Sequence, residues 1–287
     1  MIARTAPDLV RVRDVIASRG GRLGSPLVIA AETESTNDDA KRGAREGAEH
    51  GAVWLAESQT SGRGRQGRAW LSPRGENLLF SVLLRLRCAP ARVPPVSLAC
   101  GLAVRDAVAR ALGPAANDDV VVKWPNDVLV RSARDGALRK VAGVLVESAI
   151  SGAKVEYVVV GIGINVHMRS LPDEVSAIAT SIALERDSRP PGAPELDRAE
   201  ILADVLAGLD RDVEHVAHKG LGLVHARLTR YDALQGQPVE STDESVDLAG
   251  IASGIDLDGR LVVKRADGTT TRVASGEVRL RVLSAHP

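Results

Sequence analysis

Three runs of sequence decide the fold: VVVKWPNDVLV at residues 120–130, KVAGVLVES at 140–148 and VEYVVVGIGIN at 155–165. Apolar and β-branched residues dominate each run, which is typical of strands in a buried sheet. We therefore predict strands over residues 120–124, 128–131, 140–148 and 155–164.

The rest of the chain up to residue 234 alternates further strands with helices. Strands are predicted at residues 26–31, 53–57 and 78–86. Helices are predicted at 8–18, from within 34–39 to about 47, and at 94–112, 201–216 and 221–231, where apolar residues recur at helical spacing. The stretch 186–194, rich in proline, arginine and glycine, is predicted to be an exposed loop.

From residue 235 the pattern changes to short strands separated by turns. Asp258-Gly259 and Asp267-Gly268 are typical hairpin turn pairs. They predict a small all-β barrel or sandwich of about fifty residues. The expected organisation is a short N-terminal extension (1–24), a large domain (25–234) and a small C-terminal domain (235–287).

The composition excludes several classes of protein. The 287 residues include 37 basic and 37 acidic ones, so the net charge is zero and a broad nucleic-acid-binding face is disfavoured. Two cysteines, Cys88 and Cys100, argue against a disulfide scaffold or a zinc site and fit a reducing compartment. No signal peptide or membrane-spanning run is apparent, so we expect a cytoplasmic protein with no membrane partner. Residues 1–24 are too short for a helix-turn-helix domain, so DNA is not an expected partner.

The strongest local feature is a loop of glycines and arginines, GRGRQGR at residues 62–68. Glycines let the main chain approach a ligand closely and arginines supply positive charge, so the loop suits a phosphate or an acyl phosphate. The spacing also matches GxGxxG. However, no acidic residue lies about 20 positions further on and a strand follows in place of a helix, which excludes a Rossmann site. The sequence contains no GxxxxGK[ST] motif, and a solvated loop is the alternative.

Two further motifs place polar residues beside predicted strands. KWPND (123–127) ends a strand with Asn126 and Asp127, which suit a nucleotide and Mg²⁺, although a simple turn explains them as well. Lys140 begins an apolar strand, where an ammonium group can stabilise a transferring phosphate. Only six of the 37 basic residues are lysines, which favours a specific requirement here over a solvated strand edge.

Polar groups also lie at the end of one strand and at the start of one helix. GIGINV (161–166) ends a strand with glycines, which often mark the close approach of a ligand, and with Asn165, which suits a nucleotide or a phosphate. Ser35, Thr36 and Asn37 suit a small polar head group, with helix capping as the alternative. We find no Ser/His/Asp, Cys/His or paired-carboxylate pattern in the sequence.

Taken in this order, the motifs resemble those of the biotin protein ligase family. GRGRxGR, KWPND and KxxGxLxE in series are much more specific than any one of them alone, and the match covers roughly residues 28–283. The resemblance implies an α+β fold with a central mixed β-sheet backed by helices, like that of class II aminoacyl-tRNA synthetases. It also implies a small C-terminal SH3-like β-barrel.

The resemblance further implies a two-step ligation that depends on ATP. In the first step the carboxylate of biotin attacks the α-phosphate of MgATP, which gives biotinyl-5′-adenylate and pyrophosphate. In the second, a lysine on a biotin carboxyl carrier domain of a biotin-dependent carboxylase attacks the adenylate and releases AMP. Biotin and ATP are thus the implied substrates, and Mg²⁺ is the implied cofactor.

Matched motif by motif, the site residues of the family fall on defined positions of this chain. Lys140 and Arg65 would be catalytic. Biotin would be bound by Ser35, Thr36, Asn37, Gln59, Arg63, Gly64, Arg65, Trp124 and Lys140. ATP would be bound by Arg63, Arg65, Arg68, Trp70, Asn126, Asn165 and Arg281, with Trp70 over the adenine and Arg281 near the triphosphate. Asp127 would hold the metal.

One segment departs from the family pattern, and several alternatives stay open. The charged insertion at 131–139, just before Lys140, is expected to be a mobile connection. The chain is expected to be a ligase without the N-terminal DNA-binding domain that some members carry. The alternatives are a lipoate or octanoate ligase of the same superfamily, a non-enzymatic nucleic-acid binder that uses the loop arginines, and a biotin sensor without transfer.

Overall fold

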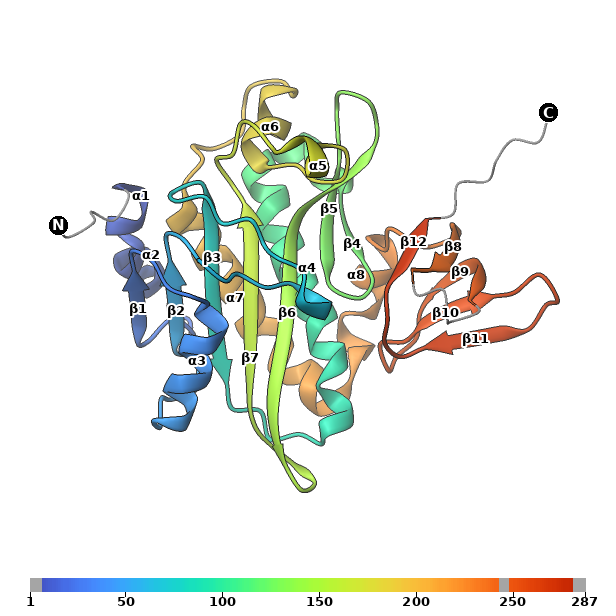
Figure 1. The fold of residues 1–287 in the computed structure, drawn as a ribbon, viewed down its shortest axis with the longest axis horizontal. Coiled ribbons are helices and arrows are strands. Elements are labelled where there is room, and N and C mark those ends of the chain that lie inside the picture. Colours follow the sequence, from blue (N-terminus) through green and yellow to red (C-terminus); the bar gives the residue numbers. More distant parts are fainter. Residues whose placement is uncertain (1–6, 243–247, 281–287) are drawn as a thin grey trace.

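The computed structural model describes residues 7–242 and 248–280 and contains two β-sheets (Figure 1). The larger sheet has seven strands in the order β1-β2-β3-β7-β6-β5-β4. β1 and β2 pair in parallel and the other neighbours are antiparallel, so the predicted mixed sheet is confirmed. The strands are β1 (Leu27–Ala30), β2 (Val53–Ala56), β3 (Asn77–Leu84), β4 (Val120–Lys123), β5 (Asp127–Arg131), β6 (Leu138–Ser151) and β7 (Lys154–Asn165).

Two long helices, α4 (Pro94–Leu112) and α7 (Arg198–Lys219), lie behind this sheet in Figure 1. α4 is buried on nearly all sides because it packs between the sheet and α7. The two helices approach closely at Gly208, where a Cβ atom would lie 2.8 Å from the Cβ of Ala103. Close packing of this kind makes the layer sensitive to volume, and a Leu102→Ala change in it would cost about 2–5 kcal/mol.

The opposite face of the sheet carries α3 (Thr36–Arg45), which packs on β2, β3 and β7. Ala40 and Ala44 of the helix meet Leu83 and Val159 of the strands. Beyond α3 this face is open to the cavity described below. Shorter helices complete the large unit: α1 (Pro7–Val10), α2 (Val12–Ser18), α5 (Asp173–Ser176), α6 (Ile182–Asp187) and α8 (His225–Arg230).

The N-terminal helices belong to the same hydrophobic core as the sheet. α2 packs against α7, and Leu9 and Val12 are fully buried. Arg198, 1% exposed, binds Asp8 and Glu57 at 2.8 and 2.9 Å and so joins α7 to α1 and to the residue that follows β2. The first described residues are thus integrated with the large unit, and the predicted boundary at residue 24 stays a prediction.

The second sheet has five antiparallel strands in the order β11-β10-β9-β8-β12, which confirms the predicted C-terminal β unit. Its strands are β8 (Pro238–Ser241), β9 (Ala249–Ile255), β10 (Leu261–Lys264), β11 (Thr270–Val273) and β12 (Val278–Leu280). Its β9–β10 turn docks on the large unit through main-chain carbonyls. Trp124 Nε1 donates to Gly259 O (3.0 Å), and His225 Nε2 lies 2.8 Å from Ile255 O.

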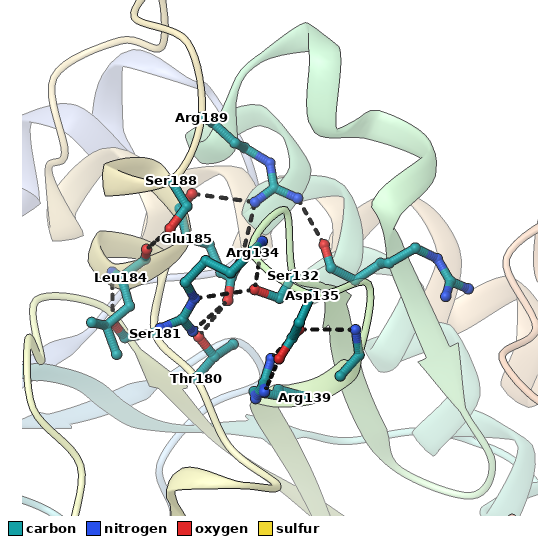
Figure 2. Close-up of polar contacts among 12 residues, drawn as sticks. Ser132, Arg134, Asp135, Arg139, Thr180, Ser181, Leu184, Glu185, Ser188 and Arg189 are labelled. Atoms are coloured by element: carbon teal, nitrogen blue, oxygen red, sulfur yellow. Dashed lines mark hydrogen bonds and ion pairs between the residues drawn. The ribbon is translucent and has the colours of Figure 1, made fainter.

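Two local expectations differ from the structure. The stretch 186–194 is not simply an exposed loop, because α6 extends to Asp187 and the side chain of Arg189 is 7% exposed. The insertion at 131–139 is held by hydrogen bonds to α6 and to itself, including a bidentate contact from Arg139 to Asp135 (Figure 2). Hydrogen bonds from Arg139 hold the pKa of Asp135 well below its usual range. Within the described ranges, no helix is both long and apolar enough to cross a bilayer.

Candidate active site

A cavity of about 560 Å³ lies on the open face of the large sheet, between the N-terminus of α3, the Gly/Arg loop and β12. It is lined by fourteen of the residues singled out in the sequence: Ser35, Thr36, Asn37, Gln59, Arg63, Gly64, Arg65, Arg68, Trp70, Trp124, Asn126, Asp127, Lys140 and Asn165. Arg281 lies outside the described residues. Residues far apart in the sequence are thus brought to one place, and their individual roles stay predictions.

One end of the cavity is lined by uncharged polar side chains. Gln59 Oε1 accepts from the main-chain N–H of Thr36 at 2.9 Å. Ser81 Oγ lies 2.8 Å from Thr36 Oγ1 and 2.6 Å from Asn37 Oδ1. Ser35 occupies the N-cap position of α3, but its side chain makes no capping hydrogen bond to the helix. The polar groups here are therefore organised around one another, and simple capping does not account for Ser35.

Three buried or partly buried residues next to this end were given no role from the sequence: Ser81, Glu147 and Lys41. Ser81 is a single hydroxyl within the apolar strand NLLFSVLL, and that isolation was the available signal. Glu147 accepts from Asn37 Nδ2 at 2.6 Å and from Lys41 Nζ at 2.9 Å. Glu147 closes the KxxGxLxE motif, so its link to Asn37 explains why an acidic residue belongs there.

Glycines form the floor of the cavity. A Cβ atom on Gly161 would lie 2.1 Å from Asn37 Oδ1, and one on Gly163 would lie 2.6 Å from Trp70 Cε2. Only glycine lets these side chains lie on the sheet so closely. Trp70 Nε1 is buried and has no hydrogen-bond partner among the described residues. The glycines of GIGIN therefore let Asn37 and Trp70 pack directly on the main chain of β7, as expected for a strand that a ligand approaches.

The other end of the cavity is charged. Lys140 Nζ lies 2.6 Å from Asp127 Oδ1 and 5.2 Å from the centre of the Trp70 ring. Asn126 Nδ2 donates to Val144 O at 2.8 Å, and Asn165 Nδ2 donates to Thr180 O at 2.9 Å. The amide nitrogens of both asparagines are thus engaged with main chain, which fixes the orientation of the two side chains.

Each arginine of the Gly/Arg loop contacts a different part of the protein. Arg63 makes two contacts with Asp38 of α3, at 2.6 and 2.7 Å. Arg65 Nη1 donates to Gly276 O at 3.1 Å, and Arg68 lies 2.6 Å from Glu277. The loop therefore bridges α3 and the C-terminal sheet above the cavity.

Asp38 is the anchor of this loop on the α3 side. Burial alone would raise the pKa of its carboxyl group, but hydrogen bonds from Arg63 and Lys41 hold that pKa below its usual value. Asp38 was assigned no role from the sequence, where it looked like an ordinary acidic residue in the first turn of a helix.

Trp124 combines two contacts. Its ring is 2% exposed and lines the cavity, as expected for a wall residue. Its indole N–H, however, donates to Gly259 O of the C-terminal sheet. KWPND therefore connects the cavity with the second sheet, a link that the sequence did not indicate.

Magnesium, which the resemblance implies, fits the single carboxylate of Asp127. Within the described residues no group of three or more His, Cys, Asp and Glu side chains could hold a metal ion. Mg²⁺ commonly takes one or two carboxylates and completes its shell with substrate phosphates and water. The cavity thus suits a magnesium ion that arrives with a phosphate ligand better than a resident one.

Comparison with known proteins finds matches to both sheets. A sequence profile described as "Biotin/lipoate A/B protein ligase family" matches residues 29–165, and one described as "Biotin protein ligase C terminal domain" matches residues 235–281. The first covers the large sheet from within β1 to the end of β7, and the second covers the sheet that contacts the Gly/Arg loop.

Individual relatives agree with the profiles. The chain is 35% identical over 256 residues to the biotin–[acetyl-CoA-carboxylase] ligase of Mycobacterium tuberculosis, which covers 88% of each chain. It is 34% identical over 231 residues to the bifunctional ligase/repressor BirA of Escherichia coli, which covers 80% of this chain and 67% of the relative. The structure of a biotin protein ligase from Aquifex aeolicus in complex with biotin and ATP matches with a TM-score of 0.71 at 28% identity, over 90% of this chain and 99% of that chain.

Proposed function

The chain belongs to the biotin protein ligase family and is a biotin–[acetyl-CoA-carboxylase] ligase, and we propose that the cavity on the open face of its large sheet carries out both steps of that ligation. The first step joins the carboxylate of biotin to the α-phosphate of ATP, with loss of pyrophosphate. The second transfers the biotinyl group to a lysine amine of a carrier domain, with loss of AMP.

The observation that carries this proposal is the division of the cavity into a neutral polar end and a cationic end. Thr36, Asn37 and Gln59 mark the first end, and Lys140 marks the second. Biotin has a neutral polar ring at one end and a carboxylate at the other, so it matches this division when the carboxylate points toward Lys140. ATP brings further negative charge to the same end.

We assign recognition of the ureido ring to the polar end. Ser35, Thr36, Asn37 and Gln59 offer donors and acceptors that a plain fatty acid would leave unpaired. A site built on such groups rejects the analogue that lacks their partners. Trp124 and the glycines of the cavity floor would then pack around the aliphatic chain of biotin.

We assign charge stabilisation to Lys140 and Arg65. Attack on the α-phosphate needs stabilisation of negative charge and no acid–base pair, because the carboxylate of biotin is already a nucleophile. Lys140 would lie between that carboxylate and the α-phosphate. Arg63, Gly64 and Arg65 would cover the reactive anhydride and exclude water from it.

We assign ATP to the side of the cavity that holds Trp70, Asn126 and Asn165, with Arg68 and Arg281 at the phosphates. The indole of Trp70 packs against Gly163 and would pack over the adenine. Asp127 would hold a magnesium ion that neutralises phosphate charge when ATP is bound. The acceptor of the biotinyl group would be a biotin carboxyl carrier domain. The cytoplasmic location, which the two free cysteines favour, stays a prediction.

Native mass spectrometry with MgATP and, separately, biotin, lipoate and octanoate tests the proposal. We expect a retained biotinyl-adenylate together with pyrophosphate release. Retention of lipoyl- or octanoyl-adenylate would move the specificity to the sister ligases of the superfamily. A folded protein that forms no adenylate from any of the three acids would refute the proposed chemistry.

A further inference from the structure

β6 carries a β-bulge next to Lys140. Leu129 of β5 pairs with Lys140, whereas its neighbour Val128 pairs with Ala142, so Val141 is an extra residue. In a regular strand Lys140 would share the face of Ala142, which is fully buried against the helices. The bulge turns Lys140 to the cavity face instead, where a Cβ on Gly143 would lie 3.1 Å from its Nζ. The direction of the ammonium group therefore depends on this irregularity.

The main chain at the bulge is held by the segment that precedes α6. Lys140 N–H donates to Ile178 O at 2.8 Å, and Lys140 O accepts from Thr180 N–H at 2.9 Å. Thr180 also accepts from Asn165 Nδ2 through its own carbonyl at 2.9 Å. One residue, Thr180, thus contacts both Lys140 and Asn165 through its main chain.

A buried carboxylate fixes Thr180 in turn (Figure 2). Glu185 and Thr180 are both 0% exposed, and Thr180 Oγ1 donates to Glu185 Oε1 at 2.7 Å. Arg189 donates to Glu185 Oε2 at 3.0 Å, and Arg134 of the insertion lies 3.4 Å from Oε1. A buried carboxylate is tolerated only when it is paired in this way, and such networks hold their members rigidly.

The same network reaches the strands on the other side of the bulge. Arg189 Nη2 donates to the carbonyl of Arg131, the last residue of β5, at 2.8 Å and to Asp119, just before β4, at 2.9 Å. α6 is therefore tied both to the strand pair that carries KWPND and to the segment that holds the bulge. Glu185 itself lies outside the cavity lining.

We propose that Glu185 is a positioning residue for the ligation, which through Thr180 holds the bulge that aims Lys140 and orients Asn165. The inference rests on the proposed function, in which Lys140 meets the carboxylate of biotin and the α-phosphate. Glu185 touches neither substrate. Its loss is expected to slow adenylate formation while the polar end of the cavity keeps its affinity for biotin.

Thr180→Val and Thr180→Ser form the most direct pair of variants, because they differ in the hydroxyl that meets Glu185. Glu185→Gln removes the charge and keeps the shape of the side chain. Asp212→Asn is the matched control, since Asp212 is a 2% exposed carboxylate of α7 that binds Arg211 and Arg227 away from the cavity. Each variant is assayed for single-turnover adenylate formation, biotin affinity, thermal stability and amide hydrogen exchange.

Thr180→Val and Glu185→Gln are expected to slow adenylate formation about tenfold or more, with biotin affinity within about threefold of wild type. Both should also speed exchange of the Lys140 and Thr180 amides. Thr180→Ser and Asp212→Asn should keep the rate, even though the second is expected to lower thermal stability.

Rates and exchange that stay at the wild-type level in Thr180→Val would overturn the inference, and so would an equal loss of rate in Asp212→Asn. A wild-type chain that forms no adenylate would refute the proposed function and the inference together. Because Thr180→Val is a mild change, a Glu185→Gln protein that does not fold still leaves the decisive comparison in place.

Discussion

The Nζ atom of Lys140 lies 2.6 Å from Oδ1 of Asp127, so the lysine assigned to the phosphate and the carboxylate assigned to magnesium form one ion pair. The two side chains are 32% and 22% exposed, which leaves both within reach of a ligand in the cavity. An arriving MgATP offers a new partner to each of them at once: phosphate oxygens to Lys140 and a cation to Asp127. We therefore expect binding of MgATP to replace this ion pair with one contact from each residue to the ligand.

Lys140→Ala is expected to slow formation of biotinyl-adenylate by about 100-fold or more, because charge stabilisation at the α-phosphate is lost. Its folding stability should change by less than about 1 kcal/mol, since a partly exposed ion pair contributes little. Quenched-flow detection of pyrophosphate and urea unfolding measure the two quantities. If the protein were a biotin sensor without transfer chemistry, Lys140→Ala would leave its function largely unchanged.

Asp127→Asn tests the magnesium assignment separately. The variant is expected to need about tenfold more Mg²⁺ for half-maximal adenylate formation, because a carboxylate ligand is lost while the shape of the side chain is kept. Titration of Mg²⁺ at saturating ATP and biotin gives this value. An unchanged magnesium requirement would show that Asp127 does not bind Mg²⁺ and serves as the ion-pair partner of Lys140.

Gly161→Ala is expected to weaken biotin binding by about 1–3 kcal/mol, because the new methyl group would displace the amide of Asn37 from the floor. Isothermal titration with biotin alone isolates this effect from ATP. Gly222→Ala is the matched control, since a Cβ there meets no atom within 4 Å and its φ is not positive. Equal biotin affinities in the two variants would contradict the placement of biotin at Asn37.

Glu277→Gln tests the contact between the C-terminal sheet and the Gly/Arg loop. The side chain of Arg68 is 64% exposed, so loss of its ion pair should leave thermal stability almost unchanged. Loss of bound adenylate is expected to become several-fold faster because the loop is held less firmly over the cavity. Release of labelled intermediate after rapid dilution measures the rate, and the effect should shrink at high salt.

Asp232 gives a prediction for pH dependence. Burial raises the pKa of its carboxyl group to about 6, and Oδ2 has no hydrogen-bond partner among the described residues. The folded state therefore holds the Asp232 proton more tightly than the unfolded state does. This proton stabilises the folded protein fully below pH 3.8, and the stabilisation disappears as the pH rises through about 6.

Asp232→Asn should remove that dependence. Relative to wild type, the variant is expected to gain up to about 3 kcal/mol in the free energy of unfolding between pH 4 and pH 7.5. Urea unfolding of both proteins across this range gives the difference directly, and other titrating groups cancel in it. A constant difference between the two proteins would show that Asp232 is not buried as a neutral acid.

The sequence was a good guide wherever hydrophobic periodicity or β-branched density was strong. Residues 94–112 were predicted as a helix with the bounds that α4 has. All seven strands of the large sheet were predicted, with ends displaced by a few residues. β12 was missed because Val278 is its single buried residue, and α5 was missed because four residues leave no helical period.

The lining of the cavity was predicted through the family motifs, whereas its internal geometry was not. Nothing in KVAGVLVE marks the bulge at Val141, because an extra residue leaves an apolar run looking the same. The insertion at 131–139 looked mobile because it is rich in arginine and glycine. In the structure its Arg134 meets a buried Glu185 that lies 51 positions away, a pairing that no local pattern reveals.

At the β9–β10 turn, the C-terminal sheet meets the large unit through main-chain carbonyls. Trp124, His225 and the N–H of Leu221 meet the carbonyls of Gly259, Ile255 and Leu257. Within that turn the side chain of Leu257 is 57% exposed and that of Asp258 is 61% exposed. This contact depends on the path of the backbone, in which Gly259 has a positive φ, so Leu257 and Asp258 can be replaced in protein engineering as long as that path is kept.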